Sequence, residues 1–168
     1  MRAEIVIPQP EEVSPKERER GLASYFMMFI SSTVGLPLPF INLVASWIFF
    51  AYTKKTSKFV KFHSLQSLLS QIPVTLLNTG LVIWVISMLV YHLEQFKDAL
   101  FTSSFIGFII AVALVNLVYL IFSIVAAVRA YNGRLYYFPY FGNVAFKYSF
   151  MKDDNYQKKV FVNKPPQL

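Results

Sequence analysis

The distribution of acidic residues constrains the fold of this chain more than any other feature. No Asp or Glu lies between Glu19 and Glu94, or between Asp98 and Asp153. Soluble domains average roughly 25 % charged residues, whereas this chain of 168 residues has 15 % charged and 55 % hydrophobic residues. Two long acid-free stretches in so apolar a chain predict an all-α integral membrane protein. The absence of cysteine excludes disulfides and thiolate metal sites.

The first of three apolar segments, residues 22–52, is too long for a single crossing. As one helix its 31 residues would be about 46 Å long, against a hydrocarbon core of about 30 Å. Gly35, Pro37 and Pro39 lie near its middle and favour a turn. We therefore predict helix breaks at Pro37 and Pro39, and four helices at about 15–36, 39–53, 58–92 and 102–131.

Basic residues support four helices over three. With four, the N-terminal region, the connection after the second helix and the C-terminal region share one side of the membrane, and they hold 15 of the 16 basic residues. Only Lys97 lies on the other side. Because basic residues accumulate in the cytoplasm, we expect a four-helix transmembrane bundle with a short first hairpin and both termini cytoplasmic. Each arm of the hairpin is only about 20–23 Å long, so the hairpin either crosses twice or is re-entrant.

The flanking regions have distinct compositions. We expect a mobile N-terminal arm at 1–13, a membrane domain at 14–133, an aromatic interfacial segment at 134–150 and a polar tail at 151–168. Ser14 and Glu17 have the spacing of a capping box, and Gly133 ends the fourth helix. The segment at 134–150, called the aromatic segment below, combines aromatic and basic residues typical of the membrane–water interface. Its candidate interface residues are Arg134, Tyr136, Tyr137 and Pro139.

Polar side chains gather on one face of the third helix. Six of them fall within a sector of about 140° at 100° per residue. A buried amide without a partner costs several kcal/mol in hydrocarbon, so this polar stripe should face other helices, a polar groove or a partner protein. Pro73 is expected to break or kink the same helix. The stripe consists of His63, Gln66, Ser67, Ser70, Gln71 and Asn78.

In the fourth helix, Gly107, Ala111 and Ala113 are candidates for close helix approach.

Two stretches resemble a known family. Residues 58–68, KFVKFHSLQSL, resemble the pattern FVRxHAxQAL, and residues 127–139, AVRAYNGRLYYFP, resemble AxxAxxGExYxYP. Both patterns occur in the Tic20-like group of small four-helix membrane proteins (the DUF4870 domain). The resemblance implies four helices with both ends on one side and, from its plastid branch, an association with protein import. Arg134 departs from the pattern, because an acidic residue is frequent there.

These features favour binding over catalysis. We expect a non-enzymatic small subunit of a larger membrane protein complex, which the resemblance associates with protein translocation or membrane-protein assembly. The alternative is an oligomeric channel or transporter for small solutes or ions. The chain shows no nucleophile–base pair, paired carboxylates or Gly-rich phosphate loop, so we expect no enzyme and no cofactor. Expected partners are lipids and integral membrane proteins but not nucleic acid, in the bacterial inner membrane.

Overall fold

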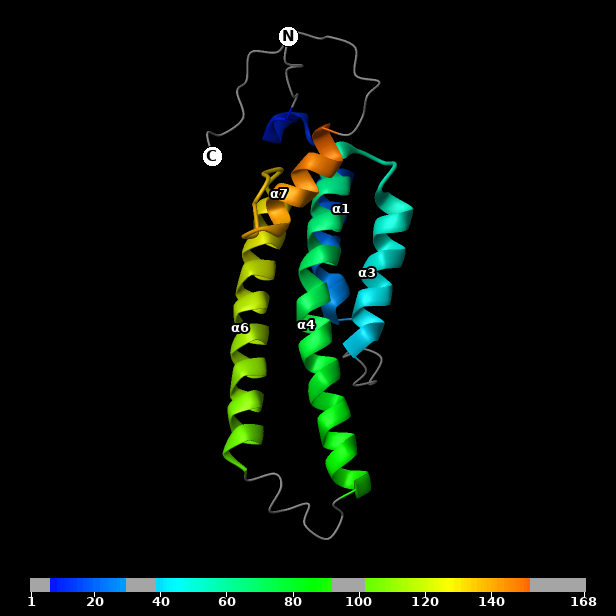
Figure 1. Cartoon of the computed structure of the whole chain (residues 1–168). Coiled ribbons are helices and arrows are strands. Elements are labelled where there is room, and N and C mark those ends of the chain that lie inside the picture. The colour runs from blue at the N-terminus through cyan, green and yellow to red at the C-terminus, as the bar shows by residue number, and fades with distance from the viewer. Residues whose placement is uncertain (1–6, 30–38, 92–101, 152–168) are drawn as a thin grey trace.

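The computed structural model describes residues 7–29, 39–91 and 102–151, and these residues contain helices but no strands (Figure 1). Three helices begin and end within one residue of the ranges expected from the sequence, whereas the first is described only to residue 29. Pro37 lies outside the described residues. In chain order the elements are a 3-10 turn Pro10–Glu12, α1 Pro15–Phe26, a 3-10 turn Met27–Phe29, α3 Pro39–Thr53, α4 Lys58–Tyr91, α6 Ser103–Tyr131, α7 Phe141–Phe146 and a π-helical turn Lys147–Met151.

Local signals set the ends of α1 and α6. The backbone N–H of Ser14 donates to Glu17 Oε2 (2.8 Å), and the backbone N–H of Glu17 donates to Ser14 Oγ (3.4 Å), which completes a capping box. At the end of α6, Gly133 has a φ of 71°. Its N–H donates to the carbonyl of Ala130, and that of Arg134 to the carbonyl of Arg129, which is the Schellman pattern.

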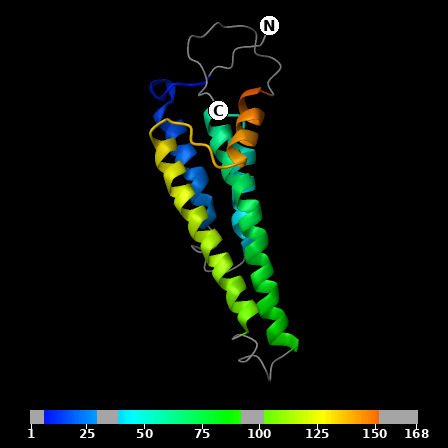
Figure 2. The same ribbon diagram turned by 60° about the vertical axis from the view of Figure 1, so that its left-hand side comes forward.

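The two long helices, α4 and α6, run antiparallel, and the shorter elements surround one end of the pair. Figure 2 shows α1 between the upper parts of α4 and α6. Gly21 permits this position, because a Cβ there would lie 3.1 Å from the ring of Phe59 and 3.3 Å from Ala130. Residues Gly107, Ala111 and Ala113, expected to mediate close approach, do not do so: nothing lies within 4 Å of a Cβ at Gly107, and both alanines are exposed. Small residues instead meet near Gly21, at the other end of α6.

The outward faces of α4 and α6 are apolar. Both helices are long and apolar enough to cross a membrane, and only 11 % and 17 % of their most apolar windows are buried inside the protein. A core helix of a soluble protein would be mostly buried, so these faces are suited to lipid instead. Exposed apolar side chains follow α6 along its length, at Ile106, Ile110, Leu114, Leu117, Val118, Ile121, Ile124 and Val128.

The hairpin arms are shorter than the helices they accompany. By helix rise α3 measures about 22 Å and α4 about 51 Å, and Figure 1 shows α3 beside only the upper part of α4. Lower down, α4 and α6 contact each other through Trp84, whose ring lies 5.5 Å from that of Phe105 and 5.3 Å from that of Phe108. Every lysine and arginine in the described ranges belongs to the opposite, upper end, where α1 and α4 begin and α3 and α6 end.

Two segments that flank the helices pack onto this upper end. Of the arm expected at 1–13, the described residues 7–13 fold against the bundle: Val13 is buried, and Arg18 Nη2 donates to the carbonyl of Pro10 (2.7 Å). The aromatic segment contains a short helix, α7, that the sequence did not indicate, and it lies across the upper part of α4 (Figure 1). The polar tail expected at 151–168 lies outside the described residues except for Met151.

Candidate functional site

The side chain of Gln66 joins the membrane helices to the aromatic segment. It is fully buried, and both its amide nitrogen and its amide oxygen have hydrogen-bond partners. Gln66 Nε2 donates to Tyr25 Oη (2.8 Å) and to the carbonyl of Tyr136 (2.9 Å). Gln66 Oε1 accepts from the backbone N–H of Phe138 (3.1 Å). One glutamine on α4 therefore holds both the tyrosine of α1 and the backbone of the aromatic segment.

His63 extends this network by one residue. Its Nδ1 lies 2.9 Å from Tyr25 Oη. Because Tyr25 Oη accepts a hydrogen bond from Gln66 Nε2, its own hydroxyl can donate a hydrogen bond to His63 Nδ1, which leaves the imidazole proton on Nε2. The His63 ring is fully buried, with ring centroids of Phe59 and Phe62 at 4.5 and 5.0 Å. Its Nε2 has no hydrogen-bond partner among the described residues.

Aromatic contacts and a glycine complete the attachment of the aromatic segment. The ring of Tyr137 lies 5.3 Å from that of Phe62, and the rings of Phe146 and Phe150 stack at 4.9 Å. Gly142 lies where no side chain fits, because a Cβ would lie 2.7 Å from Tyr137 Cα and 3.0 Å from Gln66 Oε1. The start of α7 therefore packs closely against the backbone of Tyr137 and the side chain of Gln66 on α4.

A strained turn at Tyr140 lies at the outer edge of the aromatic segment. Tyr140 has φ 66° and ψ −58°, and the N–H of Phe141 donates to the carbonyl of Pro139 (2.8 Å). These values define the rare γ-turn with a positive central φ. Such backbone conformations cost about 1–3 kcal/mol and persist where the surroundings impose them. The Tyr140 side chain is 76 % exposed.

The four candidate interface residues have different surroundings. Arg134 and Pro139 are exposed, whereas Tyr136 and Tyr137 are partly buried. Burial raises the pKa of the Tyr137 phenol. Tyr136 contributes its backbone carbonyl to Gln66 and its ring to a contact of 6.1 Å with Phe138. The outer surface of the segment thus includes Arg134, Pro139 and Tyr140.

The remaining residues of the polar stripe also point toward protein. Ser67 Oγ donates to the carbonyl of Ser24 on α1 (2.7 Å), and Ser70 Oγ to the carbonyl of Ser67 (3.0 Å). Gln71 is buried, with one long bond of 3.5 Å from its Nε2 to Ser67 Oγ. Asn78 is partly buried and bonds reciprocally with Asn116 of α6, at 3.1 and 3.0 Å.

Pro73 does not end α4, which is helical on both sides of it, and the proline is exposed. Pro39 is the first residue of α3, where a proline is favourable because its missing N–H is not needed.

Two residues of this site were not singled out from the sequence. Tyr25 is the only residue of α1 that reaches both His63 and Gln66, and Gly142 makes room for the aromatic segment. Tyr25 could have been recognised from the sequence, because a tyrosine inside an apolar segment needs a hydrogen-bond partner for its hydroxyl. The glycine gave no such signal, since its requirement arises from how Tyr137 and Gln66 pack against it in the folded chain.

The site is suited to holding structure. His63, Tyr25 and Gln66 are each enclosed, and their hydrogen bonds go to one another and to the backbone. The arrangement fixes an aromatic surface at the basic end of two apolar helices.

Comparison with known proteins identifies the family of the chain. Residues 18–145 match the model of the magnetosome magnetite crystal formation protein family. The chain is also 27 % identical over 135 residues to a UPF0132 membrane protein of Methanocaldococcus jannaschii, covering 76 % of this chain and 82 % of the archaeal protein. No solved structure matches the chain significantly. The match corrects the assignment to the Tic20-like group (the DUF4870 domain), which is wrong, and neither similarity supports protein translocation.

Proposed function

The chain belongs to the magnetosome magnetite crystal formation protein family, and from this membership we propose that it is a non-enzymatic small subunit of a membrane assembly that supports crystal formation. The matched residues, 18–145, include most of α1, all of α3, α4 and α6, and most of the aromatic segment. The archaeal relative is named only as a membrane protein. The role in a membrane assembly therefore rests on structure and similarity together, and the role in crystal formation rests on the family.

The observation that carries this proposal is the rigid, outward-facing turn at Tyr140. An exposed tyrosine held in a strained turn is costly to maintain, and tyrosine is enriched at protein interfaces. Behind it, the segment is fixed by the bonds from Gln66 and by the close approach at Gly142. A preorganised aromatic surface loses little conformational entropy when a partner binds.

The enclosed polar network supports a role without catalysis. A catalytic group must reach its substrate, whereas His63 and Gln66 are fully buried beneath the aromatic segment. The other function considered from the sequence, an oligomeric pore for small solutes or ions, is favoured by one feature, a polar cavity beside Asn78.

The topology we propose has α4 and α6 crossing the membrane and the α1–α3 hairpin entering from the basic side without crossing. The short arms support this topology. Asn42, near the start of α3, lies beside Thr75 and Asn78 in the middle of α4, so α3 begins at the depth of the middle of α4. The concentration of basic residues at the upper end supports placing that end in the cytoplasm. The membrane would be the bacterial inner membrane or one continuous with it.

Purification in mild detergent tests the assembly role. The full chain should recover a stoichiometric integral membrane partner, and Tyr140→Gly should lose it. Glycine adopts a positive φ without strain, so this change removes the ring and keeps the turn. Tyr131→Ala is the matched control, because Tyr131 is also an exposed tyrosine but lies on α6. Repeated recovery of the chain alone, or equal recovery with Tyr140→Gly, would contradict the proposal.

The role in crystal formation has its own test. In a magnetite-forming bacterium that lacks its own family member, the wild-type chain should restore crystal size, measured by electron microscopy, and Tyr140→Gly should not. Partner recovery without any effect on crystals would retain the assembly role and reject the role in crystal formation.

A further inference from the structure

An apolar groove of about 360 Å³ lies between α4 and α6. Pro73 and Val74 of α4 form part of one wall. The aromatic segment closes the upper end, where the ring of Phe138 lies 5.7 Å from that of Phe122. Pro139 and Phe141, the two neighbours of Tyr140, also line the groove, so it ends beside the strained turn. The α6 wall consists of Leu114, Val115, Val118, Tyr119 and Phe122.

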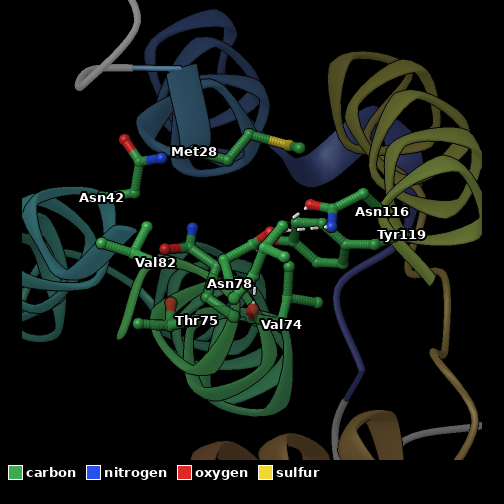
Figure 3. Close-up of a pocket in the computed structure, with 10 residues that line it drawn as sticks. Met28, Asn42, Val74, Thr75, Asn78, Val82, Asn116 and Tyr119 are labelled. Atoms are coloured by element: carbon green, nitrogen blue, oxygen red, sulfur yellow. Dashed lines mark hydrogen bonds between the residues drawn. The ribbon is translucent and has the colours of Figure 1, made fainter. Parts of the chain in front are cut away.

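The groove offers no hydrogen-bonding group to a ligand. Of its eleven lining residues only Ser70 and Tyr119 have polar side chains. Ser70 Oγ already donates to a backbone carbonyl (3.0 Å), and Tyr119 Oη is buried. The neighbouring cavity in Figure 3 differs, because Asn78 and Asn116 line it and bond to each other. Val74 and Tyr119 line both spaces and therefore separate them.

The groove opens sideways onto the surface that is suited to lipid. Pro73, Leu114 and Val118 are all exposed at this opening. A hydrocarbon chain that entered would exchange lipid contacts for contacts with packed side chains, whereas a polar solute would lose hydrogen bonds to water without replacement. A methylene group occupies about as much volume as a water molecule in the liquid, roughly 30 Å³, so the groove has room for about twelve of them.

A basic side chain lies above the groove on the same face of α6. At about 100° per residue, Arg129 falls between Val118 and Phe122 in direction. It is exposed and forms no ion pair with the residues that the structure describes. The rise from Leu114, at the lower end of the groove, to Arg129 is about 22 Å. One leaflet with its headgroup region is about 20–22 Å deep, so the arginine lies at headgroup level when the groove lies among the acyl chains.

We propose that the groove binds one acyl chain of an anionic phospholipid from the leaflet at the basic end, with the lipid phosphate at Arg129. A guanidinium donates two parallel hydrogen bonds to a phosphate, and the cytoplasmic leaflet is the one rich in anionic lipid. The proposal rests on the crossing of the membrane by α4 and α6 proposed above. Because Pro139 and Phe141 line the groove, the bound lipid lies next to Tyr140.

Native mass spectrometry of the full chain in mild detergent tests this, because it counts the lipids that each protein molecule retains. The probes are dioleoylphosphatidylglycerol and dioleoylphosphatidylcholine, which have the same acyl chains and differ in net charge. We expect one phosphatidylglycerol to bind about fivefold more tightly than phosphatidylcholine, which is the attraction of one basic residue near an anionic headgroup.

The acyl-chain site is tested by filling the groove. Val118→Trp should weaken phosphatidylglycerol binding by at least about tenfold, since displacing two buried methylene groups is enough for that loss. Leu117→Trp is the matched control: Leu117 is the next residue and is equally exposed, at 52 %, but does not line the groove. If Val118→Trp does not fold, Leu114→Trp replaces it, because Leu114 lines the same wall.

The headgroup site is tested by removing one charge. Arg129→Gln should reduce the affinity for phosphatidylglycerol to that for phosphatidylcholine, and leave the latter unchanged. Lys55→Gln is the control, because it also removes one exposed positive charge at the basic end. Lys55 follows α3, which lies on the opposite side of α4 from α6 (Figure 1). Lys55→Gln should therefore keep the preference for phosphatidylglycerol.

Four results would overturn the proposal. They are equal binding of the two lipids, equal binding by the groove-filling and control variants, a preference that survives Arg129→Gln, and a mass of two chains without lipid, which would make the groove an interface between copies. Lipid binding is measured on the purified chain alone and partner recovery is measured with Tyr140→Gly, so failure of either leaves the other standing.

Discussion

Gln66→Leu is the substitution that most directly tests the attachment of the aromatic segment. Leucine has a similar size but makes none of the three hydrogen bonds of the glutamine. Tyr25 Oη keeps its contact with His63. The carbonyl of Tyr136 and the N–H of Phe138 lose the Gln66 bonds without leaving the protein interior, so the consequence should appear in the aromatic segment and not in α4.

The expected loss follows from these two backbone groups. Each buried group left unsatisfied costs about 1–3 kcal/mol, which gives about 2–6 kcal/mol for the pair. Burial of leucine offsets up to about 2 kcal/mol. A decrease of about 3 kcal/mol in the free energy needed to open the segment corresponds to about 100-fold faster hydrogen exchange at the Phe138 amide, because 1.4 kcal/mol is a factor of ten.

Hydrogen–deuterium exchange of the purified protein in lipid nanodiscs measures this effect at the Phe138 amide. Gln71→Leu is the matched control: the same change, on the same helix, at a glutamine that is also buried. Gln71 makes only one long bond of 3.5 Å, so its replacement should leave exchange at Phe138 unchanged. If Gln66→Leu behaves like Gln71→Leu, the reasoning from unsatisfied backbone groups is refuted.

Three further results are expected. Gly142→Ala should destabilise the aromatic segment by about 1–3 kcal/mol through overpacking and speed trypsin cleavage at Arg134, whereas Gly107→Ala, with nothing within 4 Å of its Cβ, should not. The pKa of Glu17 lies below its usual 4.5: burial raises it, but hydrogen bonds from Ser14 and Ser57 and the charge of Arg20 outweigh burial. The ionised carboxylate of Glu17 should therefore stabilise the start of α1 above pH 4.5, and this stabilisation should be lost as the pH falls through the lowered pKa. The loss should appear as faster hydrogen exchange in acid, and Glu17→Gln should abolish this pH dependence. Phe40→Cys should react with a membrane-impermeant maleimide from neither side of sealed vesicles; labelling from the side opposite the lysines would show that the hairpin crosses.

The sequence predicted the parts of the fold that depend on local composition. The acid-free stretches and the prolines gave α3, α4 and α6 to within one residue, and the capping box placed the start of α1. The sector of polar residues on α4 indicated that Gln66 and Gln71 face protein. Each of these signals is local in the sequence, and the polar sector also repeats with the helical period, which is why they could be seen.

What the sequence did not reveal depends on contacts between distant residues. Gln66 bonds to backbone groups 70 and 72 residues later, and no periodic pattern marks such a pair. The candidate small residues of α6 were placed at the wrong end, because the close approach is set by Gly21 of α1. The family assignment was wrong although it concerned nearly the same part of the chain: it depended on short motifs around His63 and Gly133, whereas the match over residues 18–145 is to another family.

The separation between Gln66 and its backbone partners also has a consequence for biosynthesis. Ribosomes add about 5–20 residues per second, so α4 waits about 4–14 s before Tyr136 and Phe138 are made. During that time one amide proton and the carbonyl oxygen of Gln66 have only water, lipid headgroups or a chaperone to bind. A nascent chain truncated before residue 136 therefore leaves this amide without the backbone groups that satisfy it in the complete structure, and synthesis of the aromatic segment supplies them.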